Sequence, residues 1–163
     1  MAAKSDIDPG ATRSEVFDAV YARERAPMLR VAYLIVGSTD VAEDLVHDSF
    51  VELRRRWDRV DNPGGYLRRT VVNQCLTWRR RRGLEEAHLE RLRHDRTAAS
   101  VDAPGEPLWV LLHVLPVRQR TALVLTYYLD LSSEDAADYM NCRPSTVRSL
   151  VHRGLAALKE EFR

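Results

Sequence analysis

The sequence contains little that would support a disulfide framework, a zinc site or a membrane span. Its two cysteines, Cys75 and Cys142, lie far apart and neither belongs to a CxxC pair, so we expect two reduced thiols. No apolar run approaches the roughly 18–20 residues that span a bilayer, and the N-terminus lacks the apolar core of a signal peptide. We therefore expect a cytoplasmic chain that does not insert into a membrane.

Motifs that mark common enzyme sites are also missing. The sequence has no glycine-rich phosphate loop and no HExxH or GxSxG motif. His47 lies near three acidic residues on a predicted helix, but it is the only histidine of that cluster and no second ligand-bearing helix is evident. The sequence therefore predicts no catalytic activity, no metal site and no cofactor.

Glycine and proline are scarce, with seven of each in 163 residues, and long stretches rich in leucine, alanine and arginine predict an all-α fold. Apolar residues recur at helical spacing from residue 15 to Gly37, with a break or kink expected at Pro27. Two further helices are expected over residues 40–57 and 66–82, separated by a turn at 58–65.

The chain divides into two small helical modules joined by a flexible linker. Residues 83–107 lose sustained periodicity and end in a stretch that contains Pro104, Gly105 and Pro107. The predicted organisation is a disordered lead at 1–14, a first module at 15–82, the linker at 83–107 and a second module at 108–163.

Charge is segregated along the chain although the net charge is only +1. Residues 40–53 hold five acids and no lysine or arginine, whereas residues 54–82 hold ten arginines against Asp58 and Asp61, a local net charge of +8. Residues 83–107 are acidic again, with six acids against three arginines. This local pattern indicates a polyanionic partner, which the net charge alone would not suggest.

The segment "LSSEDAADYMNCRPSTVRSLVHRGLAALKEE" reads as two helices joined by a tight turn. Ser132 fits a capping position, Asn141 suits a left-handed turn, and Pro144 suits a first helical turn. Hydroxyls and an arginine near the start of the second helix match what a DNA major groove requires. The pattern alone leaves two interpretations open, a helix that reads DNA and a basic surface helix that closes a small bundle.

The arginine-rich helix of the first module also has two interpretations. It lies near Trp57, Tyr66 and Trp78, so it could neutralise phosphates and stack on the bases of single-stranded nucleic acid. Alternatively its polar stripe is a solvated face, and Trp57 and Trp78 are core residues.

Two stretches resemble a known family. "AEDLVHDSFVELRRRWDRVDNPGGYLRRTVVNQCLTWRRRR" resembles region two of an extracytoplasmic-function (ECF) sigma factor, the smallest class of bacterial RNA polymerase sigma subunits. "LLHVLPVRQRTALVLTYYLDLSSEDAADYMNCRPSTVRSLVHRGLAALKEEF" resembles region four. The two regions stand in the family's order, and the first is similar to the actinobacterial SigE-like branch.

The resemblance implies an alternative sigma factor that binds core RNA polymerase at its clamp helices and flap region and recognises promoter DNA. It implies nucleoid association when bound to polymerase, a linker that threads toward the RNA exit path, and control by an anti-sigma factor. The implied residues for core polymerase docking are Glu43, Asp44, Leu45, His47 and Asp48. Those implied for minus-ten recognition and melting are Asp61, Asn62, Arg68, Arg69, Asn73, Thr77 and Arg80. Those implied for minus-thirty-five recognition are Arg143, Ser145, Thr146, Arg148, Ser149, His152 and Arg153.

Three positions depart from the family pattern. His47 stands where glutamine is common, Asn141 replaces the usual turn glycine, and Arg143 replaces a capping serine. Two other functions also fit parts of the sequence. One is a helix-turn-helix regulator that binds duplex operators without polymerase, and the other is a protein-interaction adaptor whose arginines serve only solubility.

Overall fold

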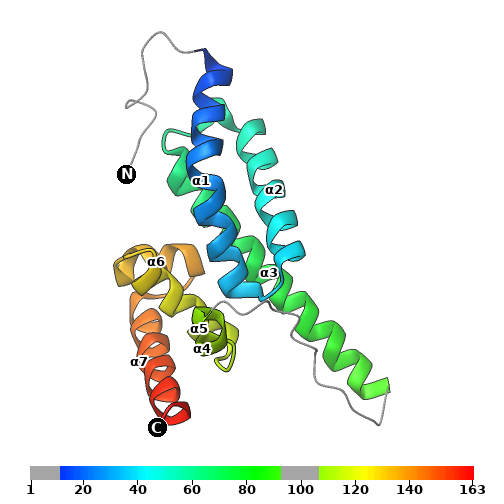
Figure 1. The fold of residues 1–163 in the computed structure, drawn as a ribbon, viewed down its shortest axis with the longest axis vertical. Helices are drawn as coiled ribbons and strands as arrows, with labels where there is room; N and C mark the ends of the chain where they lie inside the picture. The colour runs from blue at the N-terminus through cyan, green and yellow to red at the C-terminus, as the bar shows by residue number, and fades with distance from the viewer. Residues whose placement is uncertain (1–11, 93–106) are drawn as a thin grey trace.

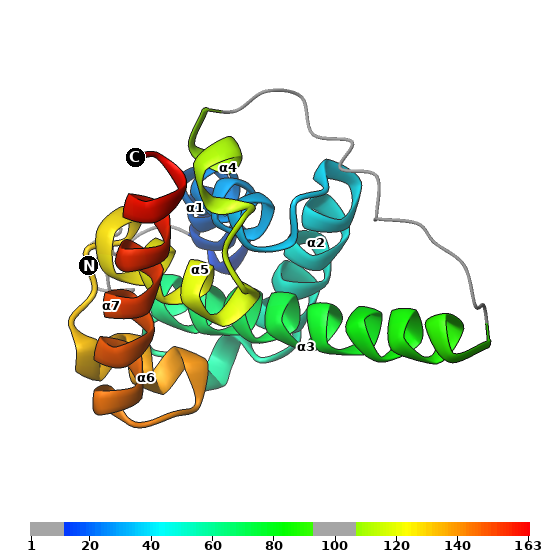
Figure 2. The same cartoon turned by 90° about the horizontal axis from the view of Figure 1, so that it is seen from below.

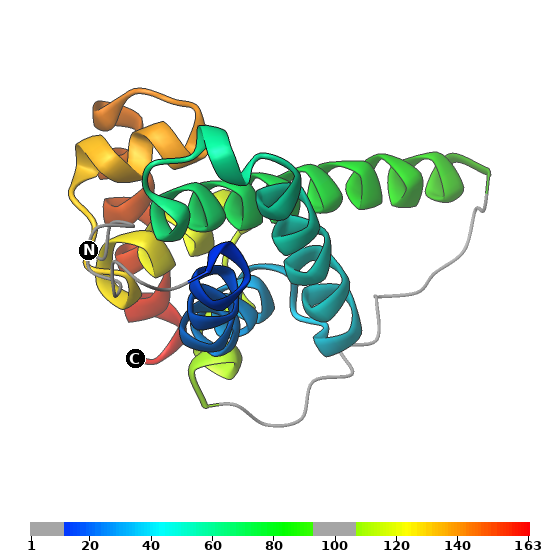
Figure 3. The ribbon, with the colours of Figure 1, turned by 90° about the horizontal axis from the view of Figure 1, so that it is seen from above.

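Three long helices form the first bundle: α1 (Arg13–Val36), α2 (Thr39–Arg55) and α3 (Pro63–Leu92) (Figure 1). They come from a computed structural model that describes residues 12–92 and 107–163. Each helix packs on the other two, and their apolar stripes meet in a core that includes Ile35, Leu53 and Leu67. Viewed from above, α1 and α2 lie side by side and α3 passes across them (Figure 3).

Helix α1 begins at a capping box and continues through Pro27 without a break. The Thr12 side chain accepts a hydrogen bond from the backbone N–H of Glu15, and the Glu15 carboxylate accepts one from the backbone N–H of Thr12. The sequence predicted a break or kink at Pro27, but Met28 and Val31 directly after it are fully buried. Tertiary packing therefore holds the helix together across the hydrogen bond that proline removes.

Helix α3 begins earlier and ends later than the sequence predicted. It starts at Pro63, inside the expected turn, and runs past residue 82 to Leu92, so it projects beyond the bundle (Figure 1). The lost apolar periodicity does not end it, because its last turns consist mainly of strong helix formers. The rest of the predicted linker, residues 93–106, and the lead over residues 1–11 lie outside the described residues.

The second bundle follows, and it consists of several short helices and the longer α7. These are α4 (Pro107–Leu112), α5 (Val117–Leu123), the π-helical turn η3 (Val124–Tyr128), α6 (Ser133–Met140) and α7 (Pro144–Glu161). Helix α7 packs on α5 and α6. The described residues contain helices and no strand, so the all-α prediction is confirmed. None of the described helices is long and apolar enough to cross a membrane.

The two bundles pack against each other, whereas the sequence indicated only a tether between them. Helices α4 and α5 contact α1, and α6 contacts α3 (Figure 2). The buried apolar side chains of both bundles form one continuous cluster. Within it the Trp109 ring lies against Gly37, the left-handed residue that ends α1, and 5.6 Å from the ring of Tyr33.

Arg120 is the buried charge of this interface. Its side chain is 3% exposed and donates hydrogen bonds of 3.1 Å to the backbone carbonyls of Ile35 and Leu115. Its guanidinium also lies 4.6 Å from the centre of the Trp109 ring. Burial, with repulsion from Arg79 as a smaller cause, lowers the pKa of Arg120 to about 10, so the group stays charged at neutral pH. Arg120 thus ties the start of the second bundle to the end of α1.

Candidate functional site

The acidic residues of α2 lie on its outer face. Ala42, Val46 and Phe50 point into the core, and this stripe leaves the other side of the helix in solvent. The docking residues implied by the resemblance share that outer side: Glu43, Asp44, His47 and Asp48 are exposed, and Leu45 is half-buried. The helix therefore presents a continuous acidic strip with one apolar side chain at its edge.

The residues implied for minus-ten recognition lie on α3 and on the turn before it. Arg69, Asn73, Thr77 and Arg80 are spaced four, four and three residues apart and so share one face of α3. Three of these are exposed and Thr77 is half-buried. The opposite stripe, which includes Val71 and Cys75, is buried. Trp57 is also buried, so the core interpretation of this tryptophan is confirmed.

Asn62 and Arg68 contribute to the turn that starts α3. The Asn62 side-chain oxygen accepts a 3.0 Å hydrogen bond from the backbone N–H of Gly65, and Arg68 donates a 3.3 Å hydrogen bond to the carbonyl of Gly64. Both side chains are half-buried, whereas Asp61 is exposed. The turn is therefore held in a fixed shape beside the polar face of α3.

Helices α6 and α7 form a helix-turn-helix, as the sequence predicted. The Ser132 side chain caps α6 by accepting a 3.0 Å hydrogen bond from the backbone N–H of Asp135. Asn141 ends α6 in the left-handed conformation, with φ of 48°. Arg143 occupies the capping position of α7 without a side-chain cap, and Pro144 fills the first turn. These features fix the angle at which α7 leaves the turn.

The outer face of α7 carries the residues implied for minus-thirty-five recognition. Val147 and Leu150 are buried on the inner face. Leu155, which helical spacing also places on that face, is 44% exposed. The implied residues are exposed apart from Thr146, which is half-buried: Arg143, Ser145, Arg148, Ser149, His152 and Arg153. Arg148 makes a loose 3.5 Å ion pair with Glu134 of α6, which leaves its guanidinium available.

Packing of the two bundles brings α6 onto the polar face of α3. A side-chain nitrogen of Arg69 lies 3.7 Å from a carboxylate oxygen of Asp138, and its guanidinium lies 5.6 Å from the centre of the Tyr139 ring. Neither Asp138 nor Tyr139 was singled out from the sequence, because nothing in the local pattern of α6 indicates a contact with a helix more than sixty residues earlier. In this arrangement one minus-ten candidate is partly covered.

Two grooves complete the candidate surfaces, and the sequence indicated neither. One has a volume of about 540 Å³ and lies between α1, the start of α2 and Tyr128 of η3, so it touches both bundles. The other, about 230 Å³, lies between α4, η3 and α7 and has an apolar lining that includes Leu112, Tyr127 and Leu155. Within residues 12–92 and 107–163, no group of three or more histidine, cysteine or acidic side chains could hold a metal ion.

Comparisons with protein families match both halves of the chain. The model of "Sigma-70 region 2" matches residues 20–85, and that of "Sigma-70, region 4" matches residues 106–158. RNA polymerase sigma-E factor from Streptomyces avermitilis is 35% identical over 87% of this chain and 83% of its own length. The Streptomyces coelicolor protein of the same name is 33% identical over 87% and 84%. The ECF RNA polymerase sigma factor SigE of Mycolicibacterium smegmatis is 32% identical over 80% of this chain and 55% of its own length.

Solved structures share the fold at lower sequence identity. The sigma factor RpoE from Bartonella quintana, solved in complex with the anti-sigma factor NepR, has a TM-score of 0.69 and 24% identity over 88% of this chain and 94% of its own. CnrH, solved with the cytosolic domain of CnrY, has a TM-score of 0.65 and 21% identity over 92% and 89%. Two matched regions in the family's order and close relatives along most of the chain lead to one conclusion: this protein belongs to the ECF class of the sigma-70 family, the transcription initiation factors that direct RNA polymerase to promoters.

Proposed function

We propose that this sigma factor binds a promoter at two elements while α2 binds core RNA polymerase, and that it has no catalytic activity of its own. The observation that carries the proposal is the separation of three polar faces on three helices. The face of α2 is acidic, and the faces of α3 and α7 contain arginines and hydrogen-bonding side chains. Each face is backed by a buried stripe of the same helix, so it is presented on a rigid support.

The acidic strip of α2 is proposed to dock on the clamp helices of the polymerase. Glu43, Asp44 and Asp48 are exposed, and no ion pair involves them within the described residues, so their charge is available to a basic partner. Leu45 at the edge of the strip adds an apolar contact. His47 takes the place of a common glutamine and would tune the strength of this docking.

The polar face of α3 and the preceding turn are proposed to hold the minus-ten element as a single strand. Asn73 can donate to and accept from a base edge, and the arginines on either side of it can bind phosphates. The turn held by Asn62 lies beside this face, where an unstacked base could be captured as the duplex opens. Trp57 is buried and Trp78 is half-buried, so we assign recognition on this face to the exposed polar groups.

Helix α7 is proposed to read the minus-thirty-five element in the major groove. Its exposed hydroxyls and arginines lie in the first half of the helix, where a recognition helix contacts base edges. Arg148 is the best placed to pair with guanine, because its ion pair with Glu134 is exposed and therefore weak. Arg153, a turn further on, would contact the DNA backbone.

Promoter binding requires the two bundles to separate. In the structure the two bundles pack together, which we call the closed arrangement. There Asp138 and Tyr139 contact Arg69, so α6 lies against the face that is proposed to hold the minus-ten strand. The segment that joins α3 to α4, residues 93–106, is proposed to let the bundles move apart on the polymerase and to thread toward the RNA exit path. Docking of each bundle on its own polymerase site would replace the contacts that are lost.

Grooves on the closed chain suit two protein partners. An anti-sigma factor in the groove of about 540 Å³ would contact both bundles at once and hold them together. The structures of RpoE with NepR and of CnrH with CnrY support this kind of partner. The apolar groove between α4, η3 and α7 is proposed to dock the flap region of the polymerase, because Tyr127 and Leu155 there are 64% and 44% exposed.

A run-off transcription assay tests the proposal directly. The purified chain is combined with bacterial core polymerase and a library of promoter templates, with core polymerase alone as control. We expect transcripts from a subset of templates only when the chain is present. If no template yields such a transcript, and the free chain instead binds a duplex operator tightly and specifically, the chain acts as a regulator without polymerase.

A further inference from the structure

A cavity at the free end of the first bundle lies between the start of α1 and the end of α2. It has a volume of about 430 Å³ and is lined by Arg13, Ser14, Phe17, Arg54 and Trp57. Cavities of roughly 300–1,000 Å³ typically hold small ligands, so this one has room for a single base or sugar. None of its residues belongs to the faces described above, and the proposed function leaves the cavity without a role.

The lining combines aromatic rings with guanidinium groups. The rings of Phe17 and Trp57 meet edge to face with their centres 5.2 Å apart, and the guanidinium of Arg54 lies 5.5 Å from the centre of the Phe17 ring. Trp57 is buried and supports Phe17, which is only half-buried. Aromatic rings and flat guanidinium planes both stack on unpaired nucleobases, whereas two positive charges disfavour a metal ion or an apolar ligand.

The second guanidinium is held by a weak partner. Arg13 forms a 2.9 Å ion pair with Asp58, and the two side chains are 63% and 71% exposed. Exposed ion pairs contribute little, so a phosphate can replace the Asp58 carboxylate at Arg13. Asp58 lies in the short 3-10 helix η2 (Trp57–Arg59), which directly precedes the turn that contains Asp61 and Asn62. The cavity is therefore adjacent to the turn that is proposed to capture the minus-ten strand.

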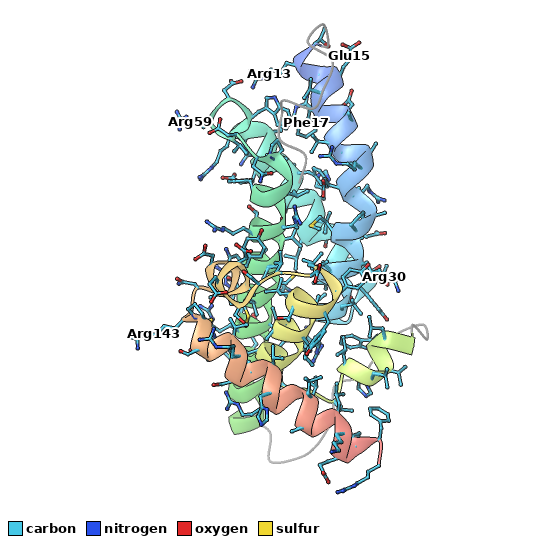
Figure 4. All side chains as sticks on the ribbon, turned by 90° about the vertical axis from the view of Figure 1, so that its left-hand side faces the viewer. Arg13, Glu15, Phe17, Arg30, Arg59 and Arg143 are labelled. Carbon is cyan, nitrogen blue, oxygen red and sulfur yellow. The ribbon has the colours of Figure 1, made fainter. Side chains whose placement is uncertain are left out.

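The cavity stays open when the bundles are closed. Arg13, Phe17 and Arg59 gather at one end of the molecule, well away from Arg143 at the start of α7 (Figure 4). Helices α4 and α5 pack near the other end of α1, where Ile35 and Gly37 lie. Binding at this cavity can therefore be measured on the free full-length chain.

We propose that this cavity binds one nucleobase of single-stranded DNA, stacked against Phe17 and Arg54, with a neighbouring phosphate on Arg13. The choice of strand rests on the proposed function: a single strand that leaves the turn at Asp61 and Asn62 and passes Asp58 reaches this cavity next. Paired bases cannot enter, because a duplex keeps them stacked inside the helix.

Fluorescence anisotropy with a short labelled oligothymidylate tests the proposal. Phe17→Leu removes the ring but keeps apolar volume, and Arg54→Gln removes the guanidinium. Each should weaken binding roughly tenfold, within the range that stacking of one base supports. The matched control is Arg25→Gln, which removes the same charge from an exposed position of α1 outside the cavity and should change binding less than about twofold. Circular dichroism of each variant checks that the fold is retained.

A variant that is expected to tighten binding strengthens the test. Asp58→Asn removes the carboxylate that competes for Arg13, so the oligonucleotide should bind more tightly. Asp18→Asn, at an exposed position on α1, removes an equal charge without freeing Arg13 and should have a smaller effect. Photocrosslinking with a strand that contains 5-iodouracil should label Phe17 or Trp57.

Several results would overturn the proposal: equal losses in Arg54→Gln and Arg25→Gln, equally tight binding of the matching duplex, or crosslinks confined to other helices. Competition by inorganic phosphate that matches competition by thymidine monophosphate would reduce the cavity to an anion site and also overturn it. These measurements need neither polymerase nor a promoter. A cavity that binds single strands in a chain that never supports transcription would count against the proposed function alone.

Discussion

Replacing Gly37 by alanine tests whether the two bundles pack in solution as they do in the structure. Gly37 ends α1 with φ of 79°, a left-handed conformation, and an added Cβ would overlap atoms Cζ2 and Cη2 of the Trp109 ring. That ring is 4% exposed and contacts both the Tyr33 ring and the guanidinium of Arg120. It therefore cannot move away without shifting α4 from α1.

The expected destabilisation has two parts. Left-handed backbone costs a residue with a Cβ about 1–2 kcal/mol, and this part acts on the first bundle alone. The displaced Trp109 also loses packing. Complete truncation of a buried tryptophan costs about 3–5 kcal/mol, which sets an upper limit for this second part because the ring is moved rather than removed. Gly37→Ala should therefore lower the free energy of unfolding by about 2–5 kcal/mol.

Urea unfolding followed by far-ultraviolet circular dichroism measures this in a double-mutant cycle. The four chains are the natural protein, Gly37→Ala, Trp109→Ala and the double variant. Without the ring, Gly37→Ala should cost only the backbone part of about 1–2 kcal/mol. The difference between the two backgrounds is the coupling energy, expected at about 1–3 kcal/mol. Small-angle scattering should show a larger radius of gyration for Gly37→Ala than for the natural protein.

Gly83 provides the matched control. A Cβ at Gly83 meets nothing within 4 Å, and the residue lies inside α3, so Gly83→Ala should stabilise the chain by about 0.5–1 kcal/mol. An equal cost of Gly37→Ala with and without the Trp109 ring, together with an unchanged radius of gyration, would refute the packing of Trp109 on Gly37.

Three further results are expected. Asn73→Ala should impair promoter opening, measured with permanganate footprinting, more than closed-complex binding, because Asn73 is proposed to hold the separated strand; equal loss of both contradicts strand capture. Arg148→Ala should relax sequence preference in the upstream element by about 1–3 kcal/mol at one base pair, measured against a library of sites, whereas a uniform loss marks a phosphate contact. Burial raises the pKa of Cys75 to about 12, so its thiol stays protonated at pH 8. Iodoacetamide should therefore alkylate half-buried Cys142 but not Cys75 until urea is added, as measured by peptide mass spectrometry. Comparable labelling of Cys75 in the native protein would show that the core opens.

Local features were predictable because they depend on a few neighbouring residues. A serine three residues before an acid predicts a cap, and Ser132 provides one. An asparagine between two helical patterns predicts a left-handed turn, and Asn141 adopts it. The apolar stripes of α2 and α3 likewise follow from helical spacing alone. The polar faces opposite those stripes, which contain most of the candidate site, were therefore predictable too.

Features that depend on packing between distant segments were not predictable in the same way. A break or kink was expected at Pro27, but α1 continues through this residue and the residues after it pack into the core. Leu155 fits the apolar stripe of α7, yet it is 44% exposed and lines a groove. The cavity at Phe17 and Arg54 joins residues from two helices whose mutual rotation a single-sequence pattern does not give. Each case requires the position of a second helix.

Arg120 explains how the closed arrangement can be specific and still separable. Its partners at the interface are neutral carbonyls and the Trp109 ring, and no carboxylate in the described chain lies within ion-pairing distance. A buried charge without an opposite charge is costly. When the bundles part, the guanidinium regains its hydration, and this gain in free energy offsets much of the apolar packing energy that is lost. The carbonyl of Ile35 fixes where Arg120 docks, because it points from the last turn of α1. The same contact therefore sets the geometry in which α6 covers Arg69 and limits the free energy needed to uncover it.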